Sequence, residues 1–590
     1  MPRARVGLLL TAMVCLFFRL GELALVEPSE GRYAEIGREM LESGDWVTPH
    51  LNYQRHLEKP PFAYWMIALG IRAWDADNFG ARFMATVFGT LLVLLVFEIG
   101  AWLYDALAGL LAGLVLLAHP LFFVVVRSAT ADVFVTAWGA AAVWAFLRWY
   151  DAPTRPVSWR LVYWLCLGVG MLTKGPVVFV HGLLPVVVFL GLRREWGVLR
   201  RLGFMSGLPL SLIFIVPWML LLERGTPGAF EYLVLRKATG ALTSSAGYHD
   251  EPLWYYVPGL LFGCMPWSFF LPAFWSTELR PKVEPDFNPR TAQSLSRGRD
   301  VVAGGEVGDL EKPPVGGTAI GAGHLAEARR RWAALFLFGW WPALFLVFTA
   351  SAAKLMTYLL PITIPIALMN GRLFAEILRR PEARLPLPVV VAAYAWLVLI
   401  AVLTLAAPVF LLLPQEGLMA GAHGVLPLVF LAGAAYLTSI AAVRSPARRG
   451  WVPLLTVAFL LVLFQIGISG RKATEVQYSS VEPIGRHLQA HAAPGARVVC
   501  YRCFIRSIPF YARRRVYLVD YDKEDDVFDR QAPGFSDWVL FGQDQLLAMV
   551  KGPETVWVIT KVKYLEASAE LAAATRVVDR NGSVVLLTNR

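Results

Sequence analysis

Apolar residues fill long runs across the first 470 residues of the chain. A membrane-spanning helix needs about 20 consecutive, mostly apolar residues, and thirteen runs reach or approach that length. Their approximate bounds are 6–26, 82–104, 107–127, 131–149, 159–173, 175–192, 203–223, 254–275, 332–350, 355–378, 387–413, 421–443 and 451–469. A shorter apolar run, 61–75, predicts an interfacial or re-entrant helix. The pattern therefore predicts a mostly α, polytopic membrane protein with about 13 transmembrane helices.

The pattern changes after residue 470. The runs ARVVCY, RVYLVD and ETVWVIT are typical of strands, and SVEPIGRHLQAH is typical of a helix. We therefore expect a transmembrane domain over 1–470 and a small α/β soluble domain over 471–590. Within the first domain, residues 27–80 predict an extramembrane loop with interfacial helices. The Gly-, Pro- and charge-rich stretch 276–331 predicts a flexible loop.

Arginine-rich connections suggest an orientation. If the N-terminus lies in the cytoplasm and sides alternate after each helix, the cytoplasmic connections include RWYDAPTRPVSWR, RREWGVLRR, EARRRW, RRPEAR and RSPARRG. This distribution is what the positive-inside rule requires. The odd helix count then places the C-terminal domain outside the cytoplasm. The first apolar run resembles a signal peptide, but no small-residue cleavage site follows it, so we interpret it as a retained helix.

Composition agrees with a membrane protein. Hydrophobic residues make up 56% of the 590 residues and charged residues only 17%, where soluble proteins carry about 25%. The net charge of +11 is explained by the basic loops, and no aromatic–basic array indicates nucleic acid binding. Five cysteines do not form a disulfide framework. Cys500 and Cys503 form a lone CxxC without the second ligand pair of a zinc site, which leaves structural thiols or a local disulfide.

Several ionisable residues converge on the non-cytoplasmic face in this topology. They are Glu30, Arg32, Glu58, Lys59, Asp132, Lys174, His249 and Lys354, with Tyr358 near the last of them. Ionisable residues at membrane depth are costly and are candidates for function. Simpler interpretations also apply. Arg32 is able to bind lipid headgroups, Lys174 to snorkel, and Glu58 and Lys59 to form a surface pair. Glu35, Arg38, Glu39 and Glu42 have the spacing of the wet face of an interfacial helix.

The chemistry of this set suits an amphiphilic phosphate. Lysine and arginine neutralise the charge that grows on a leaving phosphate, and a divalent metal held by Glu and His is able to share that task. A carboxylate is able to accept the proton of an acceptor hydroxyl. The pattern fits transfer of a group from a lipid phosphate carrier.

Four stretches carry a resemblance to a known family. RYAEIGREMLESGDWVTPHLNYQRHLEKPPFAYW, MLTKG, HDEPLWYYVPGL with MPW, and KLMTYLLP run in family order across residues 30–361. At these stretches the chain resembles the GT-C membrane glycosyltransferases that use polyprenyl-phosphate sugars. The similarity is greatest to the bacterial lipid A aminoarabinose transferases, which are related to the protein O-mannosyltransferases.

The resemblance implies roles for the candidate residues. It assigns Glu58 and His249 to a divalent metal ion (zinc, magnesium or manganese) and Lys59 to the phosphate. It places Asp132 and Lys174 at the cavity. Tyr358 matches a residue that lines the donor site, and we assign Lys354 to the donor as well.

It further implies a sugar donor on undecaprenyl phosphate, inversion at the anomeric carbon, and a lipid, glycan or protein acceptor. The implied location is the bacterial inner membrane, among membrane lipids, with the active site facing the periplasm.

One family residue is missing. The family commonly has an Asp-Glu pair before xRYAE, where this chain has Ser29 and Glu30. Three explanations are open: Glu30 takes the role of the acid, with Arg32 orienting it; Glu27 reaches back; or the acceptor needs no strong base. We predict that Glu30 is the catalytic carboxylate.

Two other functions stay open: an oligosaccharide ligase, or a lipid-linked substrate transporter or flippase. The second predicts broken helices near mid-membrane and internal repeats.

Overall fold

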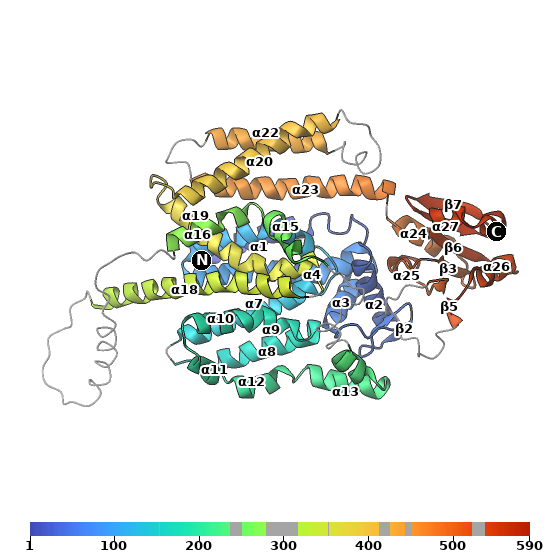
Figure 1. The fold of residues 1–590 in the computed structure, drawn as a ribbon, viewed down its shortest axis with the longest axis horizontal. Helices are drawn as coiled ribbons and strands as arrows, with labels where there is room; N and C mark the ends of the chain where they lie inside the picture. The colour runs from blue at the N-terminus through green and yellow to red at the C-terminus, as the bar shows by residue number, and fades with distance from the viewer. Residues whose placement is uncertain are drawn as a thin grey trace.

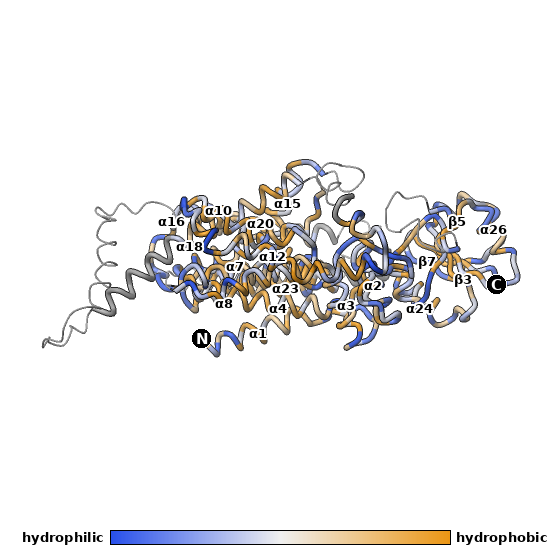
Figure 2. The backbone as a smooth tube through the Cα atoms, turned by 90° about the horizontal axis from the view of Figure 1, so that it is seen from below, coloured by the Kyte–Doolittle hydropathy of each residue, from blue (hydrophilic) through white to orange (hydrophobic). Residues whose placement is uncertain are grey.

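The computed structural model describes the chain except for residues 153, 237–250, 279–316, 352, 412–424, 443–449, 479 and 522–536. A bundle of long helices forms most of the molecule, and a sheet domain made by the C-terminal residues lies at one end of it (Figure 1). Hydrophobic residues predominate along the bundle helices, whereas α2 and the C-terminal domain are more mixed (Figure 2). The predicted fold class, a mostly helical membrane protein with a small α/β domain, is confirmed.

Each predicted apolar run contains helix, but the helix count is not confirmed. Six continuous helical segments are long and apolar enough to span a membrane, or up to eight if two bent pairs each count as one span, within the described residues. The bundle helices are α1 (Pro2–Phe17), α4 (Asn78–Leu103), α5 (Ala106–Leu117), α6 (Pro120–Val126), α7 (Asp132–Asp151), α8 (Val157–Lys174), α9 (Val177–Gly182), α10 (Leu184–Leu192), α11 (Gly197–Arg201), α12 (Phe204–Ser211), α13 (Ile215–Gly225), η1 (Glu231–Arg236), η2 (Leu253–Tyr255), α15 (Tyr256–Gly263), η3 (Trp267–Phe270), α16 (Leu271–Glu278), α18 (Gly317–Ala350), η4 (Met356–Ile362), α19 (Thr363–Arg379), α20 (Leu387–Leu411), α22 (Leu426–Ala442) and α23 (Val452–Tyr478).

The first helix is shorter than predicted, since α1 ends at Phe17 and not at residue 26. Two arginines from other helices bind the carbonyl groups that follow it. Arg127 donates to the carbonyls of Leu16 at 2.5 Å and Phe18 at 2.9 Å. Arg82 donates to the carbonyl of Ala24 at 2.8 Å. These bonds satisfy the unpaired carbonyls of a helix end, so the apolar segment after residue 17 is held as irregular chain.

Two helix pairs are bent where proline interrupts them. The axes of α5 and α6 differ by 68° at a break before Pro120, and the α15 helix differs from the following one by 97° at a break that contains Pro266. Proline lacks the backbone N–H that would continue a helix. The indole of Trp267 donates to the carbonyl of Ala118 at 3.3 Å. A side chain at the second break thus supplies a hydrogen-bond donor to a backbone carbonyl at the first break.

Two shorter predictions have different outcomes. The run at 61–75 forms a helix, α3 (Phe62–Trp74), one side of which is buried. The predicted loop 276–331 is wrong in its last part, because helix α18 begins at Gly317. That helix continues into the apolar run that starts at residue 332, and most of the remaining stretch lies outside the described residues.

The C-terminal domain is a six-stranded mixed sheet with helices. The strand order is β5-β4-β3-β6-β8-β7, in which β5, β4, β3 and β6 are parallel and β8 is antiparallel to both of its neighbours, β6 and β7. The elements are α24 (Glu482–His491), β3 (Arg497–Tyr501), α25 (Ser507–Ala512), β4 (Tyr517–Val519), β5 (Val539–Leu540), α26 (Gln543–Lys551), β6 (Val556–Lys561), α27 (Val562–Glu566), α28 (Ala569–Ala574), β7 (Arg576–Asn581) and β8 (Val584–Thr588).

This domain packs on the first extramembrane loop, which carries α2 (Ser29–Ser43) and the hairpin of β1 (His50–Leu51) and β2 (Gln54–Arg55). The carboxylate of Glu27 accepts the backbone N–H groups of Arg506 and Ser507 at 3.1 and 2.7 Å, at the start of α25. Gly31 allows this approach, because a Cβ there would lie 2.7 Å from the nitrogen of Ser507. The amide of Asn52 pairs with the backbone of Val516 through two bonds of 2.8 Å.

The C-terminal domain changes the environment of α2. We predicted that Glu35, Arg38, Glu39 and Glu42 form a wet face, but the first three are buried and only Glu42 is exposed. The predicted ion pairs do form, because Arg38 contacts Glu35 at 2.7 Å and Glu42 at 2.5 Å. Burial and the neighbouring Glu35 charge raise the pKa of Glu39 well above its usual value. The wet-face prediction is wrong because residues 513–516 and the hairpin cover this side.

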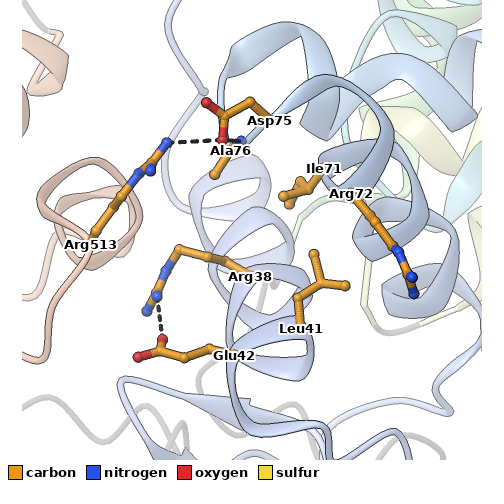
Figure 3. Close-up of a pocket in the computed structure, with 8 residues that line it drawn as sticks. All are labelled: Arg38, Leu41, Glu42, Ile71, Arg72, Asp75, Ala76 and Arg513. Carbon is orange, nitrogen blue, oxygen red and sulfur yellow. Dashed lines mark hydrogen bonds and ion pairs between the residues drawn. The ribbon is translucent and has the colours of Figure 1, made fainter.

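A cavity is left where α2, α3 and the C-terminal domain meet (Figure 3). It encloses about 530 Å³ and is lined by Arg38, Leu41, Glu42, Ile71, Arg72, Asp75, Ala76 and Arg513. Arg513 reaches across the interface to Asp75 at 3.1 Å. The cavity walls therefore come from both domains.

Candidate functional site

An ion pair between Asp132 and Lys174 forms one half of the candidate site. The distance from Lys174 Nζ to Asp132 Oδ1 is 2.5 Å. Asp132 begins α7 and Lys174 ends α8, which packs against α7. Both charges are favourable there, since helix N-termini favour anions and C-termini favour cations. Gly175, with a φ of +65°, and Pro176 end α8 directly after the lysine. The sequence therefore fixes this pair at the ends of two neighbouring helices.

The aromatic ring of Tyr358 closes this half of the site. Lys174 Nζ lies 4.3 Å from the centre of the ring, a cation–π contact. Thr357, the residue before it, hydrogen-bonds to Asp132. The short helix η4 thus places the side chains of Thr357 and Tyr358 against the ion pair.

Glu58 and Arg32 form the other half. Arg32 Nη1 lies 2.5 Å from Glu58 Oε2, and His56 Nε2 lies 3.2 Å from the same oxygen. The hairpin turn at Asn52 and Tyr53, both with positive φ, directs the chain back toward α2. Burial disfavours the charged form of Glu58, but the His56 hydrogen bond and the charges of Lys59 and Arg32 outweigh it, and its pKa lies well below the usual value. Glu58 is therefore ionised at neutral pH.

Lys59 joins the two halves. Its ammonium donates to the hydroxyl of Tyr33 at 3.2 Å, and its charge acts on Asp132. Burial disfavours the charged form of Lys59, but Tyr33 and Glu58, with a contribution from Tyr358, raise its pKa overall. Within the part of the chain that the structure describes, no carboxylate lies at ion-pair distance from Lys59. It is therefore a charged ammonium that is not neutralised by direct contact.

The predicted residues Arg32, Glu58, Lys59, Asp132, Lys174 and Tyr358 thus lie together. Three cations face two carboxylates, which leaves one positive charge in excess. Such a site is complementary to an anion, and the largest single electrostatic contribution in phosphate chemistry comes from cations placed in advance.

Glu30 lies beside this cluster but is fully engaged. It accepts four hydrogen bonds: from Arg82 Nε and Nη2 at 2.9 and 2.8 Å, and from the backbone N–H groups of Ala129 and Val26 at 2.7 and 2.9 Å. A carboxylate has about four lone-pair sites. Burial raises the pKa of Glu30, but Arg82 and the two backbone donors outweigh burial, so the pKa lies below its usual value. These contacts favour a structural role, and the catalytic role of Glu30 stays a prediction.

The alternative acid, Glu27, is also engaged, because its carboxylate caps α25. Lys354 is buried, and its ammonium donates to the carbonyl of Glu251 at 2.9 Å. It therefore holds the segment that follows the undescribed residues 237–250. Its assignment to the donor stays a prediction.

Of the two predicted metal ligands, Glu58 and His249, the structure describes only Glu58. His249 lies outside the described residues. Within the described ranges, no group of three or more His, Cys, Asp and Glu side chains is placed to hold a metal ion. Glu58 and His56 supply two donor side chains, and Arg32 shares the same glutamate oxygen. The described donors do not complete a metal site.

Three neighbours of the site were missed at the level of sequence. His56 is 1% exposed and contacts Glu58. Tyr64 packs 5.1 Å from Tyr33, and its buried hydroxyl has no hydrogen-bond partner within the described structure. Arg82 holds Glu30. Only Arg82 carried a usable signal, since an isolated arginine near the start of an apolar run requires a partner.

The chain is similar to known proteins across this region. Residues 8–233 match the family described as "Dolichyl-phosphate-mannose-protein mannosyltransferase". The undecaprenyl phosphate-alpha-4-amino-4-deoxy-L-arabinose arabinosyl transferase of Enterobacter sp. (strain 638) is 28% identical over 366 residues, which cover 61% of this chain and 57% of that protein. Transferase 1 of the same name from Sodalis glossinidius is 35% identical over 271 residues, 44% of this chain and 48% of that one. The chain thus spans about half the length of the curated relatives it matches.

A solved structure covers far more of the chain. The crystal structure of ArnT from Cupriavidus metallidurans bound to undecaprenyl phosphate matches with a TM-score of 0.78, over 99% of this chain and 98% of that one, at 23% identity. The chain has the fold of ArnT. The resemblance to GT-C polyprenyl-phosphate-sugar glycosyltransferases is confirmed, and the fold match includes the C-terminal domain, which the ArnT of C. metallidurans shares. Its apo form matches equally well, with a TM-score of 0.78.

Proposed function

We propose that this chain is a membrane glycosyltransferase that moves a sugar from undecaprenyl phosphate to lipid A or another acceptor. The observation that carries the proposal is the joining of Lys59, Lys174 and Arg32 into one buried site with excess positive charge. The sequence similarity to arabinosyl transferases and the fold of a protein bound to undecaprenyl phosphate support the same donor.

The cations act on the leaving group. Lys59, which has no carboxylate in direct contact, is the group to which we assign the donor phosphate. Lys174 is held at the phosphate side by Asp132 and Tyr358. Negative charge grows on the phosphate as the bond to the anomeric carbon breaks, so these ammonium groups stabilise the transition state more than the ground state. Attack from the opposite face of the sugar gives inversion.

The choice of nucleophile depends on the carboxylates near the site, and Glu30, Glu58 and Asp132, which the structure describes, are all engaged. Glu30 binds Arg82 and two backbone groups, Glu58 binds Arg32, and Asp132 binds Lys174. Ser29 stands where the family commonly has an acid. We therefore propose that the acceptor supplies a phosphate oxygen, which is already ionised near pH 7 and needs no general base. A phosphorylated glycolipid such as lipid A meets this condition.

We also propose the orientation. Arg148 lies near the end of α7 opposite to Asp132, and Arg160 lies near the end of α8 opposite to Lys174. The positive-inside rule assigns that end to the cytoplasm. The candidate site and the C-terminal domain would then face the periplasm of a bacterial inner membrane. Binding of a divalent metal at Glu58 and His249 stays a prediction, and metal analysis of the purified chain before and after chelation tests it.

The test of function is a transfer assay with purified protein, a panel of undecaprenyl-phosphate sugars and a membrane lipid extract. We expect sugar on a phosphorylated lipid with the wild type, and a loss of at least a hundredfold in Lys59→Met, where the charge is removed but the length is kept. Arg513→Met, at the outer cavity of Figure 3, is the matched control. Folded wild type without transfer or donor hydrolysis would favour the transporter interpretation. Prior dephosphorylation of the acceptor lipid tests the nucleophile separately.

A further inference from the structure

A second cavity lies at the opposite end of the bundle from the candidate site. It is an open pocket of about 540 Å³, lined by the end of α7, the connection to α8, the α10–α11 segment and Trp332 of α18. Helix α7 begins at Asp132 and ends at Asp151, so at 1.5 Å per residue the two sites are about 28 Å apart along the helix. Figure 1 places α11 and α2 toward opposite ends of the molecule. The second cavity is therefore no part of the transfer site.

Arginine dominates the charge around this cavity, which we name the arginine pocket. Its lining contains three arginines (Arg155, Arg193 and Arg201), no lysine and two acids (Asp151 and Glu195). One of the acids, Glu195, is neutralised internally: Arg193 lies 2.7 Å away and the hydroxyl of Tyr150 donates to it at 2.6 Å. Arg155 and Arg201 then stand against the second acid, Asp151, which leaves one positive charge in excess among the lining residues.

Two arginines that line the pocket have no carboxylate at ion-pair distance among the described residues. Nη1 of Arg155 is buried and has no hydrogen-bond partner in the described part of the chain. Its guanidinium carbon lies 5.3 Å from the ring centre of Trp149, which fixes the position of the group. Arg201 is exposed and has no carboxylate at ion-pair distance among the described residues. Membrane orientation requires only basic residues in a loop, and it does not explain why a guanidinium nitrogen at this pocket is buried without an acceptor in the described structure.

We propose that the arginine pocket binds a phosphate group, either the phosphodiester of an anionic lipid headgroup or a free phosphate ion. The guanidinium fork matches phosphate oxygens with two parallel hydrogen bonds. Basic pockets between transmembrane helices are known to accept lipid headgroups. Trp332 lines the pocket, and Trp196, which is 54% exposed, stands next to it. Tryptophan is enriched where a protein meets the headgroup layer.

The test is a titration of the full-length chain in detergent, followed by the midpoint of thermal unfolding and by native mass spectrometry. The three probes are phosphatidylglycerol, phosphatidylcholine and inorganic phosphate. We expect phosphatidylglycerol to raise the midpoint saturably and to remain bound, while phosphatidylcholine does neither. An equal effect of inorganic phosphate would assign the site to the free ion. Identical curves for the two lipids, with no effect of phosphate, would overturn the proposal.

Variants separate a built site from general positive charge. Arg155→Gln should weaken the apparent affinity about tenfold, the effect of one charge-assisted hydrogen bond. Arg201→Gln changes an exposed side chain, so it tests the pocket even if Arg155→Gln fails to fold. Arg384→Gln is the matched control: it removes the same charge at an exposed position outside the pocket. A loss in Arg384→Gln as large as in the pocket variants would overturn the proposal.

Discussion

The variant Glu30→Gln distinguishes a structural glutamate from a catalytic one. All five N–H donors of Arg82 have acceptors: the two oxygens of Glu30 and the carbonyls of Leu20, Leu23 and Ala24. Glutamine keeps the shape of the side chain but leaves the buried guanidinium without a counter-charge. Removing one partner of a buried ion pair costs about 3–5 kcal/mol. We therefore expect a loss of stability of this size.

The rate measurement gives the second half of the test. Loss of a general base lowers the rate about 10²–10⁴-fold. If Glu30 only holds Arg82, the folded fraction of Glu30→Gln should transfer sugar within about tenfold of the wild-type rate. A double-mutant cycle with Arg82→Gln should give an interaction energy of about 2–3 kcal/mol in stability, because the two groups form a buried ion pair at 2.8 Å.

Unfolding midpoints and single-turnover transfer, both measured on the same purified samples, decide the outcome. A variant with wild-type stability and a rate at least a hundredfold lower would refute the structural interpretation. It would restore Glu30 as the acid that replaces the missing family residue at Ser29.

Three further predictions concern the surroundings of the site. The raised pKa of Glu39 means that its contribution to stability is complete below the unfolded pKa of about 4.3 and is lost as the pH rises through the folded pKa. The thermal unfolding midpoint of the wild type should therefore fall between pH 5 and 9, and that of Glu39→Gln should fall less. Parallel curves for the two proteins would contradict this. The hydroxyl of Tyr64, which has no partner among the described residues, costs about 1–3 kcal/mol. Tyr64→Phe should therefore stabilise the ligand-free protein while raising the KM for the donor about tenfold. An unchanged KM would show that the hydroxyl does not meet the donor. Glu27→Ala removes the cap of α25, which is worth about 1 kcal/mol, and should speed amide exchange at Arg506 and Ser507, with Glu22→Ala as the control; unchanged exchange at these amides would argue against the cap.

The sequence predicted the fold well where the signal is local. Apolar runs located the helices, and alternating short runs located the sheet domain after residue 470. Asp132 and Lys174 were predicted to lie on the same face of the membrane domain, and in the structure they form an ion pair. The end of α1 was not predictable, because it depends on carbonyl contacts from Arg82 and Arg127, which lie far away in sequence.

The candidate site was predicted less completely. Helical spacing assigned Glu35, Arg38 and Glu39 to a wet face, since a charged stripe normally faces water. The face is covered by the C-terminal domain, and no local pattern in α2 indicates that partner. Likewise, the engagement of Glu30 by four donors depends on three separate segments. Residue type identified the charged groups, but only tertiary contacts separate those that face a substrate from those that hold the scaffold.

The capping of α25 by Glu27 has a consequence for the order in which the protein becomes active. Arg32 lies on a helix made early in translation, yet the segments before and after that helix bind residues 506–516, which follow the last apolar run. A nascent chain that has inserted every apolar segment therefore still lacks a finished site. A chain that ends before residue 506 would therefore occupy the membrane without the contacts that hold the segments around Arg32.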